Sequence, residues 1–290
     1  MLQGLLLIAL AAVSWGTTGS VTAVLVDRAA AQPLLIGTVR LAVAAVLLLL
    51  GARIIAGPLA IARGDLPRCL AMAACMAAYQ ATYFTAVTMT GIVLAALISI
   101  CSAPVIIAAL AVGLLGEHLT GRVALALVLG VLGTALLIAD PVPAGPAPRF
   151  LAGTLLALGA GVAYALYVVT AKASLARTAP LPLTAVTFTA AALFTLPLLA
   201  WTDAPVAQVA RGWPWLLYLG AVATAGAYAL YSVGLRRVPA SVAGVVTLLE
   251  PLTATLLGVF IFGERLSGTG ITGAALLLTA IVLLLVDQSR

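Results

Sequence analysis

The chain has 290 residues, of which 64% are hydrophobic and 8% are charged, whereas a soluble domain carries roughly 25% charged residues. So few charges cannot cover a water-facing surface, which excludes a soluble globular protein and indicates an integral membrane protein. The net charge of +6 is spread over single or paired cations such as Arg236-Arg237, so no basic patch for nucleic acid is present.

Ten apolar segments of the sequence are long enough to cross a membrane as helices, which takes about 20 residues for a hydrocarbon core of roughly 30 Å. The continuous apolar runs exclude a transmembrane β-barrel, whose strands alternate over about ten residues. We therefore predict an all-α integral membrane protein with ten transmembrane helices. In chain order the expected spans are 2–26, 33–55, 67–89, 91–113, 121–139, 151–172, 182–201, 213–235, 240–262 and 268–286.

The segment 140–149 separates the fifth and sixth spans and contains four prolines, which interrupt helices. We expect a first five-helix repeat over 1–140, a proline-rich linker over 141–149 and a second repeat over 150–290. If the N-terminus is cytoplasmic, nine Lys and Arg residues lie in cytoplasmic segments, four lie outside, and Arg40 lies within a span. This bias predicts that both termini are cytoplasmic.

The two halves resemble each other in sequence. The segments Gly116–Gly121 (GEHLTG) and Gly263–Gly268 (GERLSG) share four of six residues, and the same offset of 147 aligns Pro104 with Pro251. Because five spans is an odd number, the second copy must enter the membrane from the opposite side. Such an inverted-topology repeat is the architecture of many secondary transporters, whose substrate site lies near the midplane where the halves meet.

Two charged residues lie deep inside predicted spans, away from the span ends. Glu250 lies near the middle of span nine, where an acid costs about 2.5–3.5 kcal/mol on insertion scales. It could contact a substrate amine or carry a proton, or it could be a structural carboxylate that is protonated or paired within the bundle. Arg40 lies about 10 Å deep in span two at 1.5 Å per residue, where its side chain could extend to the interface or hold a substrate carboxylate.

Pro104 and Pro251 occupy matched positions in mid-span. Each removes the backbone donor for the carbonyl four residues earlier, which must then find another partner. The matched prolines are either hinges or static kinks that pack the bundle.

Aromatic residues follow two patterns. Trp201, Trp213, Trp215 and Tyr218 lie at helix ends, as interface-belt residues do. Seven others lie at or near mid-span, where buried hydroxyl and indole N–H groups need partners. They are Trp15, Tyr79, Tyr83, Tyr164, Tyr167, Tyr228 and Tyr231. Interhelical packing could account for some of them, but their gathering on spans one, three, six and eight favours a shared aromatic-lined cavity.

Other small residues are expected to serve packing. The cysteines Cys69, Cys75 and Cys101 all fall in apolar segments without CxxC spacing, so we expect neither a disulfide nor a metal site. The glycines of Gly130-x-x-Gly133 and Gly268-x-Gly270-x-x-Gly273 are typical of close helix packing in membranes.

The chain resembles the drug/metabolite transporter superfamily, specifically its EamA-type bacterial exporters, and looks most like the aromatic amino-acid exporters. The resemblance rests on the five-plus-five arrangement, the repeated GEHLTG/GERLSG signature, Leu249-Glu250-Pro251, and Tyr228-x-x-Tyr231 followed by Leu235-Arg236. It implies that spans one to four and six to nine surround a cavity, while spans five and ten buttress the outside.

We therefore expect a carrier in a bacterial plasma (inner) membrane that exports amino acids with aromatic or apolar side chains, or related metabolites, by alternating access. Protons are a possible coupling ion. The alternatives are a multidrug or other metabolite efflux carrier and a passive channel, although a channel would need rings of charge or a carbonyl filter. One histidine and one mid-span acid are too few for a membrane enzyme, so we expect no catalytic residues, no cofactor and no metal.

Overall fold

The structure, a computed structural model, describes residues 1–138, 147–263 and 267–286. Across these residues, ten helical segments are long and apolar enough to cross a membrane, which confirms the predicted all-α architecture. The elements in chain order are α1 (Leu2–Gly16), α2 (Thr18–Ala29), α3 (Pro33–Ile55), α4 (Leu66–Thr90), α5 (Ile92–Leu115), α6 (Gly121–Ile138), α7 (Ala147–Ser174), α8 (Pro180–Thr195), η1 (Leu196–Trp201), α9 (Pro205–Gly220), η2 (Ala221–Gly226), α10 (Ala227–Leu235), α11 (Ala240–Val246), α12 (Leu249–Phe262) and α13 (Gly268–Val286). Most of the predicted linker 141–149 lies outside the described residues.

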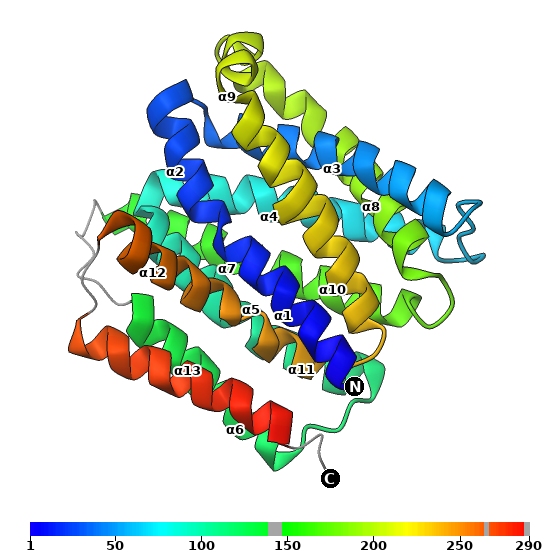
Figure 1. Ribbon diagram of the computed structural model, residues 1–290, viewed down its shortest axis with the longest axis vertical. Coiled ribbons are helices and arrows are strands. Elements are labelled where there is room, and N and C mark those ends of the chain that lie inside the picture. Colours follow the sequence, from blue (N-terminus) through cyan, green and yellow to red (C-terminus); the bar gives the residue numbers. More distant parts are fainter. Residues whose placement is uncertain (139–146, 264–266, 287–290) are drawn as a thin grey trace.

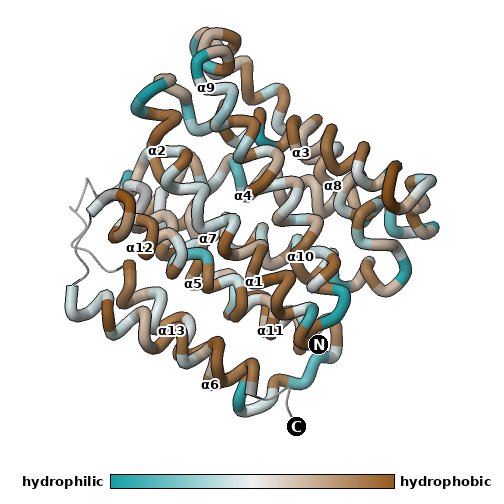
Figure 2. Tube along the Cα trace, viewed as in Figure 1, coloured by the Kyte–Doolittle hydropathy of each residue, from teal (hydrophilic) through white to brown (hydrophobic). Residues whose placement is uncertain are grey.

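Apolar side chains cover the outside of the bundle as well as its core. Figure 2 shows hydrophobic residues along the lengths of the helices and hydrophilic residues mainly at their ends and connecting turns. Large side chains such as Leu50, Leu132 and Phe260 are exposed, and lipid is the solvent in which such a surface is stable.

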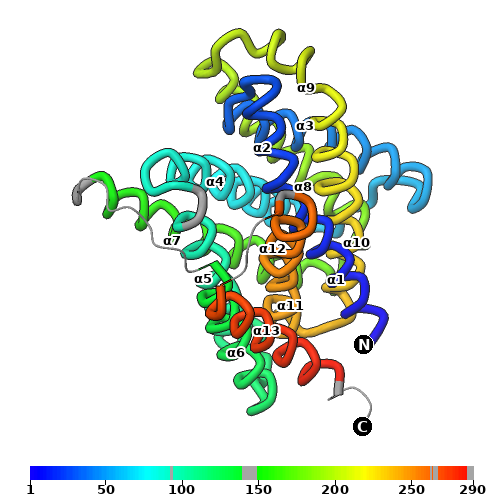
Figure 3. Tube along the Cα trace, turned by 60° about the vertical axis from the view of Figure 1, so that its left-hand side comes forward, coloured from blue at the N-terminus to red at the C-terminus, as the bar shows by residue number. Residues whose placement is uncertain are grey.

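The two halves have the five-plus-five arrangement, and their last helices pair with each other. Helices α6 and α13 lie side by side at one edge of the molecule (Figures 1 and 3). A β-carbon added at Gly133 would lie 2.7 Å from the carbonyl oxygen of Gly273, and one added at Gly273 would lie 2.5 Å from that of Gly133. This reciprocal contact confirms the predicted glycine packing at these two positions, because any larger side chain would separate the helices.

The remaining helices interleave the two halves. Helix α1 of the first half packs against α10 of the second, α3 packs against α8, and α4 packs against α7. Spans one and nine are interrupted, since α1 gives way to α2 at Thr17 and α11 gives way to α12 around Thr247.

The two matched prolines act differently on their helices. Pro251 lies where span nine breaks, and the Thr247 carbonyl, deprived of the proline donor, accepts the backbone N–H of Glu250 at 3.0 Å. Pro104 instead lies inside the uninterrupted helix α5. The break in span nine places Glu250 in the first turn of α12, where the helix dipole favours a negative charge.

A buried acid joins the two halves at the face that carries the N-terminus. Asp65, in the turn before α4, is 0% exposed and accepts hydrogen bonds from Arg177 of the second half, from the Thr178 hydroxyl at 2.8 Å and from Arg68 at 3.2 Å. The hydrogen bond from the Arg177 guanidinium holds the pKa of Asp65 below its ordinary value, so the carboxylate stays charged at neutral pH.

Candidate substrate cavity

A cavity of about 770 Å³ lies between the two halves, which is the size of a small-molecule site. Its lining residues belong to α1–α5, α7, α10 and α12, with the end of α6, Thr247 just after α11 and Ser267 just before α13. Among the described residues α8, which is span seven, contributes none of the lining. The end of α6, which is span five, does line the cavity. Both findings differ from the arrangement that the family resemblance implies.

The cavity opens at the face opposite the N-terminus. Its lining extends to Asp27 near the end of α2, Pro33 at the start of α3 and Val87 near the end of α4, and Asp27 is exposed. The ends of α2 and α4 lie at the left in Figure 1, away from the N-terminus.

Five of the seven mid-span aromatic residues line the cavity. They are Trp15, Tyr79, Tyr83, Tyr164 and Tyr228. Their rings contact one another in a chain: the ring centroids of Tyr83 and Tyr79 are 5.8 Å apart, those of Tyr79 and Tyr164 are 5.8 Å apart, and those of Trp15 and Tyr228 are 4.8 Å apart. The sequence placed these residues on several helices, and the fold joins them into one aromatic wall.

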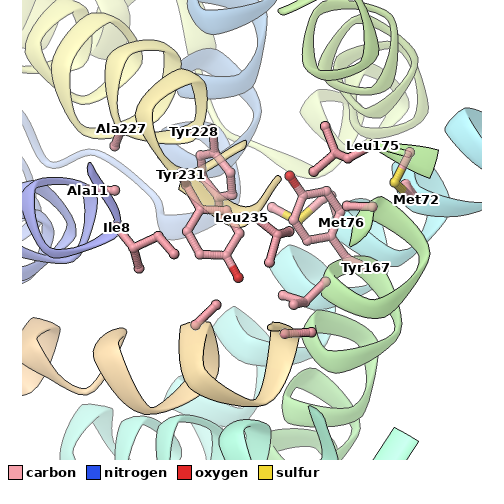
Figure 4. Packing of buried hydrophobic residues seen from close by; sticks show 14 of the residues in the cluster. Ile8, Ala11, Met72, Met76, Tyr167, Leu175, Ala227, Tyr228, Tyr231 and Leu235 are labelled. Carbon is pink, nitrogen blue, oxygen red and sulfur yellow. The ribbon is translucent and has the colours of Figure 1, made fainter. Parts of the chain in front are cut away.

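The other two aromatic residues, Tyr167 and Tyr231, lie behind this wall. Their exposed fractions are 2% and 0%, and Figure 4 shows them packed among buried apolar side chains that include Met76 and Leu235. The Tyr231 ring is 5.2 Å from the Trp15 ring, and the Tyr167 ring is 6.0 Å from the Tyr228 ring. They support the lining residues and do not line the cavity themselves.

Arg40 and Glu250 place opposite charges in the same cavity, on α3 and α12 respectively. The Nε of Arg40 donates to the Thr224 hydroxyl at 3.0 Å, and this hydroxyl donates in turn to the Leu219 carbonyl at 2.7 Å within the π-helical turn η2. Arg40 is thus anchored at the cavity wall. Sequence reasoning missed Thr224, because nothing in the pattern of span eight indicates a π-helical turn.

The side-chain carboxylate of Glu250 makes no hydrogen bond and no ion pair at contact distance within the described parts of the chain. Its charge interacts with that of Arg40 across the cavity. Its helix is packed closely on the first span: a β-carbon added at Gly16 would lie 2.7 Å from the Glu250 carbonyl oxygen. Both matched prolines, Pro104 and Pro251, also line the cavity, next to the two helix segments on which a hinge would act.

The face that carries the N-terminus is closed by a contact between the halves. The carboxylate of Glu117, which follows α5, accepts the backbone N–H of Ala240 at 2.6 Å, the N–H of Ser241 at 3.1 Å and the Ser241 hydroxyl at 2.8 Å. We call this set the closing contact. Glu117 belongs to the repeated GEHLTG segment, so the repetition itself was the signal that could have pointed to it.

A lysine binds the turn between α10 and α11, which leads to the residues that Glu117 contacts. The Nζ of Lys172 on α7 donates to the carbonyl oxygens of Leu235 at 2.9 Å and Val238 at 2.7 Å. A β-carbon added at Gly4 would lie 2.8 Å from the Val238 side chain, so the start of α1 also packs on this turn. The α10–α11 turn is therefore packed between α1 and α7 at the face that carries the N-terminus.

Ten apolar spans in two inverted halves, with a cavity that holds aromatic and charged side chains and opens at one face, define a membrane transporter. The chain belongs to the EamA-like transporter family, whose model matches residues 2–139 and 151–286.

Individual relatives are also transporters, and only some of their names state a substrate. The chain is 38% identical to "Uncharacterized transporter YwfM" of Bacillus subtilis over 96% of this chain and 92% of that protein. It is 30% identical to the threonine/homoserine exporter RhtA of Salmonella typhimurium over 45% of this chain and 44% of the exporter. A solved crystal structure with 20% identity superposes with a TM-score of 0.85 over 99% of each chain, which establishes likeness of fold.

Proposed function

We propose that this transporter exports amino acids with aromatic or other apolar side chains, or closely related small metabolites, across a bacterial inner membrane by alternating access. The observation that carries the proposal is that one cavity holds an aromatic wall, an anchored arginine and an unpaired glutamate. A zwitterionic amino acid carries the three groups that complement them. The partial match to a threonine/homoserine exporter supports amino acids as the substrate class.

Each part of the site has a separate task in this proposal. The guanidinium of Arg40 donates charge-assisted hydrogen bonds to the substrate carboxylate, while Glu250 accepts from the ammonium group. The rings of Tyr79, Tyr83 and Trp15 stack on an apolar side chain. A polyphosphate substrate would need several deep cations, and among the described lining residues Arg40 is the only one.

An aromatic preference is the expected result of counterflow measurements in proteoliposomes against a panel of amino acids. An aromatic contact is worth about 0.5–1.5 kcal/mol beyond area burial, so phenylalanine should be favoured over leucine about three- to tenfold. The variants Tyr79→Ala and Tyr83→Ala should lower this ratio toward one. Trp213→Ala, at an exposed interface position, is the matched control and should leave the ratio unchanged. Equal losses for both amino acids in the tyrosine variants would show that the rings only hold the bundle together.

A second candidate function, efflux of amphipathic organic cations, is favoured by one feature of the cavity. An unpaired carboxylate beside several aromatic faces is also suited to a cation that lacks a carboxylate. Such compounds belong in the same counterflow panel, where a cation that competes better than any amino acid would favour this alternative.

Alternating access requires the closed face to open, and the closing contact must then break. Three hydrogen bonds of the Glu117 carboxylate link the end of α5 to the start of α11, and these helices belong to different halves. Separation of the halves at this face would leave the first-turn amides of α11 to water. We propose that this contact stabilises the state in which the opposite face is open.

The variant Glu117→Gln is expected to shift the population toward opening of the closed face. Hydrogen bonds to charged groups are worth about 1.5–3 kcal/mol, so the equilibrium should move about tenfold. The measurement is thiol labelling of purified protein that lacks its natural cysteines, with single cysteines at Ala243, one turn beyond Ala240 on α11, or at Ala96 in the cavity wall. Labelling should rise about tenfold at Ala243→Cys and fall at Ala96→Cys.

The opposite responses of the two positions separate this shift from unfolding, which would increase labelling at both. Asp203→Asn makes the same acid-to-amide change outside the cavity and should alter neither rate. If Glu117→Gln leaves both rates as they are, the contact does not hold the face closed.

A further inference from the structure

Gln80 is a polar residue of the cavity wall that the sequence analysis did not single out. Its side chain is 4% exposed, and the residue lines the cavity on α4 between Tyr79 and Tyr83. Across the described ranges its amide has no hydrogen-bond partner. The Gln80 amide atoms are not among the fully buried unpaired polar atoms, so they are accessible from the cavity, where a ligand or water can complete their hydrogen bonds.

The Gln80 amide lies against the turn of α3 that carries Arg40. A β-carbon added at Gly37 would lie 3.6 Å from the Nε2 of Gln80 and 2.9 Å from the Phe84 ring. Gly37 precedes Arg40 by three residues, so both occupy one face of α3. Glycine at position 37 therefore lets the Phe84 ring pack closely on this face of α3, with the amide of Gln80 in van der Waals range of the same face.

The Gln80 amide and the Arg40 guanidinium together have the donors that a carboxylate requires. Arg40 keeps its terminal nitrogens available, because the bond to Thr224 uses Nε. The glutamine amide supplies two further N–H donors. A carboxylate has two oxygens that accept several hydrogen bonds, and buried carboxylates are bound most tightly when both oxygens are paired.

We propose that Gln80 is a substrate-binding residue that, beside Arg40, donates to the carboxylate of the substrate and thereby selects carboxylic acids over their neutral derivatives. This inference rests on the proposed amino-acid transport and deepens it. Gln80 and Arg40 then form the carboxylate subsite on the first half of the protein. Glu250 on the second half takes the ammonium group, so the substrate bridges the two halves.

The test compares phenylalanine with its methyl ester, which keeps the ring and the ammonium group but has no carboxylate charge. Each is used unlabelled to compete with counterflow of labelled phenylalanine in proteoliposomes. In Gln80→Met, which keeps the side-chain length and removes the donors, the preference for the acid over the ester should fall about tenfold, as expected for loss of a hydrogen bond to a charged group. In Gln80→Glu the added negative charge should lower the preference further.

Gln3→Met makes the same change at an exposed residue and should keep the parental preference. An unchanged acid-to-ester preference in both Gln80 variants, with overall transport reduced, would overturn the inference and leave Gln80 a packing residue. A parent protein without phenylalanine counterflow would instead overturn the proposed function itself, so the two failures are distinguished within one experiment.

Discussion

Replacing Arg40 with leucine is expected to reduce the apparent affinity for amino acids about a hundredfold in counterflow, because truncation of one partner of a buried charge pair costs about 2–5 kcal/mol. Arg40→Lys should lose less, about tenfold, since lysine keeps the charge but cannot donate as a planar fork. The methyl ester of phenylalanine should lose little in either variant, because it brings no carboxylate to the site.

The matched control is Arg211→Leu, which removes an exposed cation that donates to the carbonyl of Ala207 on its own helix and should leave affinity unchanged. A contradictory result would be an equal loss for the acid and the ester in Arg40→Leu. In that case Arg40 would act through its bond to Thr224, by holding the π-helical turn, and Thr224→Val would reproduce the loss.

Glu250→Gln is expected to abolish uptake driven by a pH gradient while counterflow of substrate remains measurable. A pH gradient drives transport only if a group binds a proton at one face and releases it at the other, and an amide cannot do so. Glu250 is the carboxylate of the deep cavity wall, whereas Asp27, the other acid among the described lining residues, lies at its mouth. Counterflow needs no net proton movement, so it should fall only about tenfold, through the weaker contact with the ammonium group.

The two measurements are made on the same proteoliposomes, with Asp203→Asn as the acid-to-amide control outside the cavity. Unchanged pH-driven uptake in Glu250→Gln would remove this residue from coupling. A parent protein whose uptake does not respond to a pH gradient would identify facilitated diffusion, and the task of Glu250 would then be substrate binding alone.

The spans and the inverted repeat could be predicted because they depend on local sequence. Twenty apolar residues satisfy their own backbone groups as a helix in lipid, so length and composition sufficed for all ten spans. The five-plus-five arrangement followed from the repeated Gly-Glu segments and an odd number of spans per half. Close packing at Gly133 was also predictable, because a glycine in an apolar helix allows a neighbouring backbone to approach.

The site required the tertiary structure, because it is formed by side chains from helices that are distant in sequence. All seven mid-span aromatic residues look alike in the sequence, yet only the packing of α1, α4, α7 and α10 decides that Tyr79 lines the cavity and that Tyr231 lies behind it. The same holds for Pro104 and Pro251, which match in sequence but differ in whether their helix breaks.

By itself the sequence determined the membrane class, the ten helices, the two inverted halves and the charged residues that had to lie within the membrane. Only the tertiary structure decided which of those residues share a cavity, that Arg40 is anchored by Thr224 and that Glu117 binds the start of α11. It also decided that the Gln80 amide has no partner among the described residues. The physical reason is that helix formation in lipid satisfies hydrogen bonds within one segment, whereas a binding site depends on which side chains of separate segments are left without partners after packing.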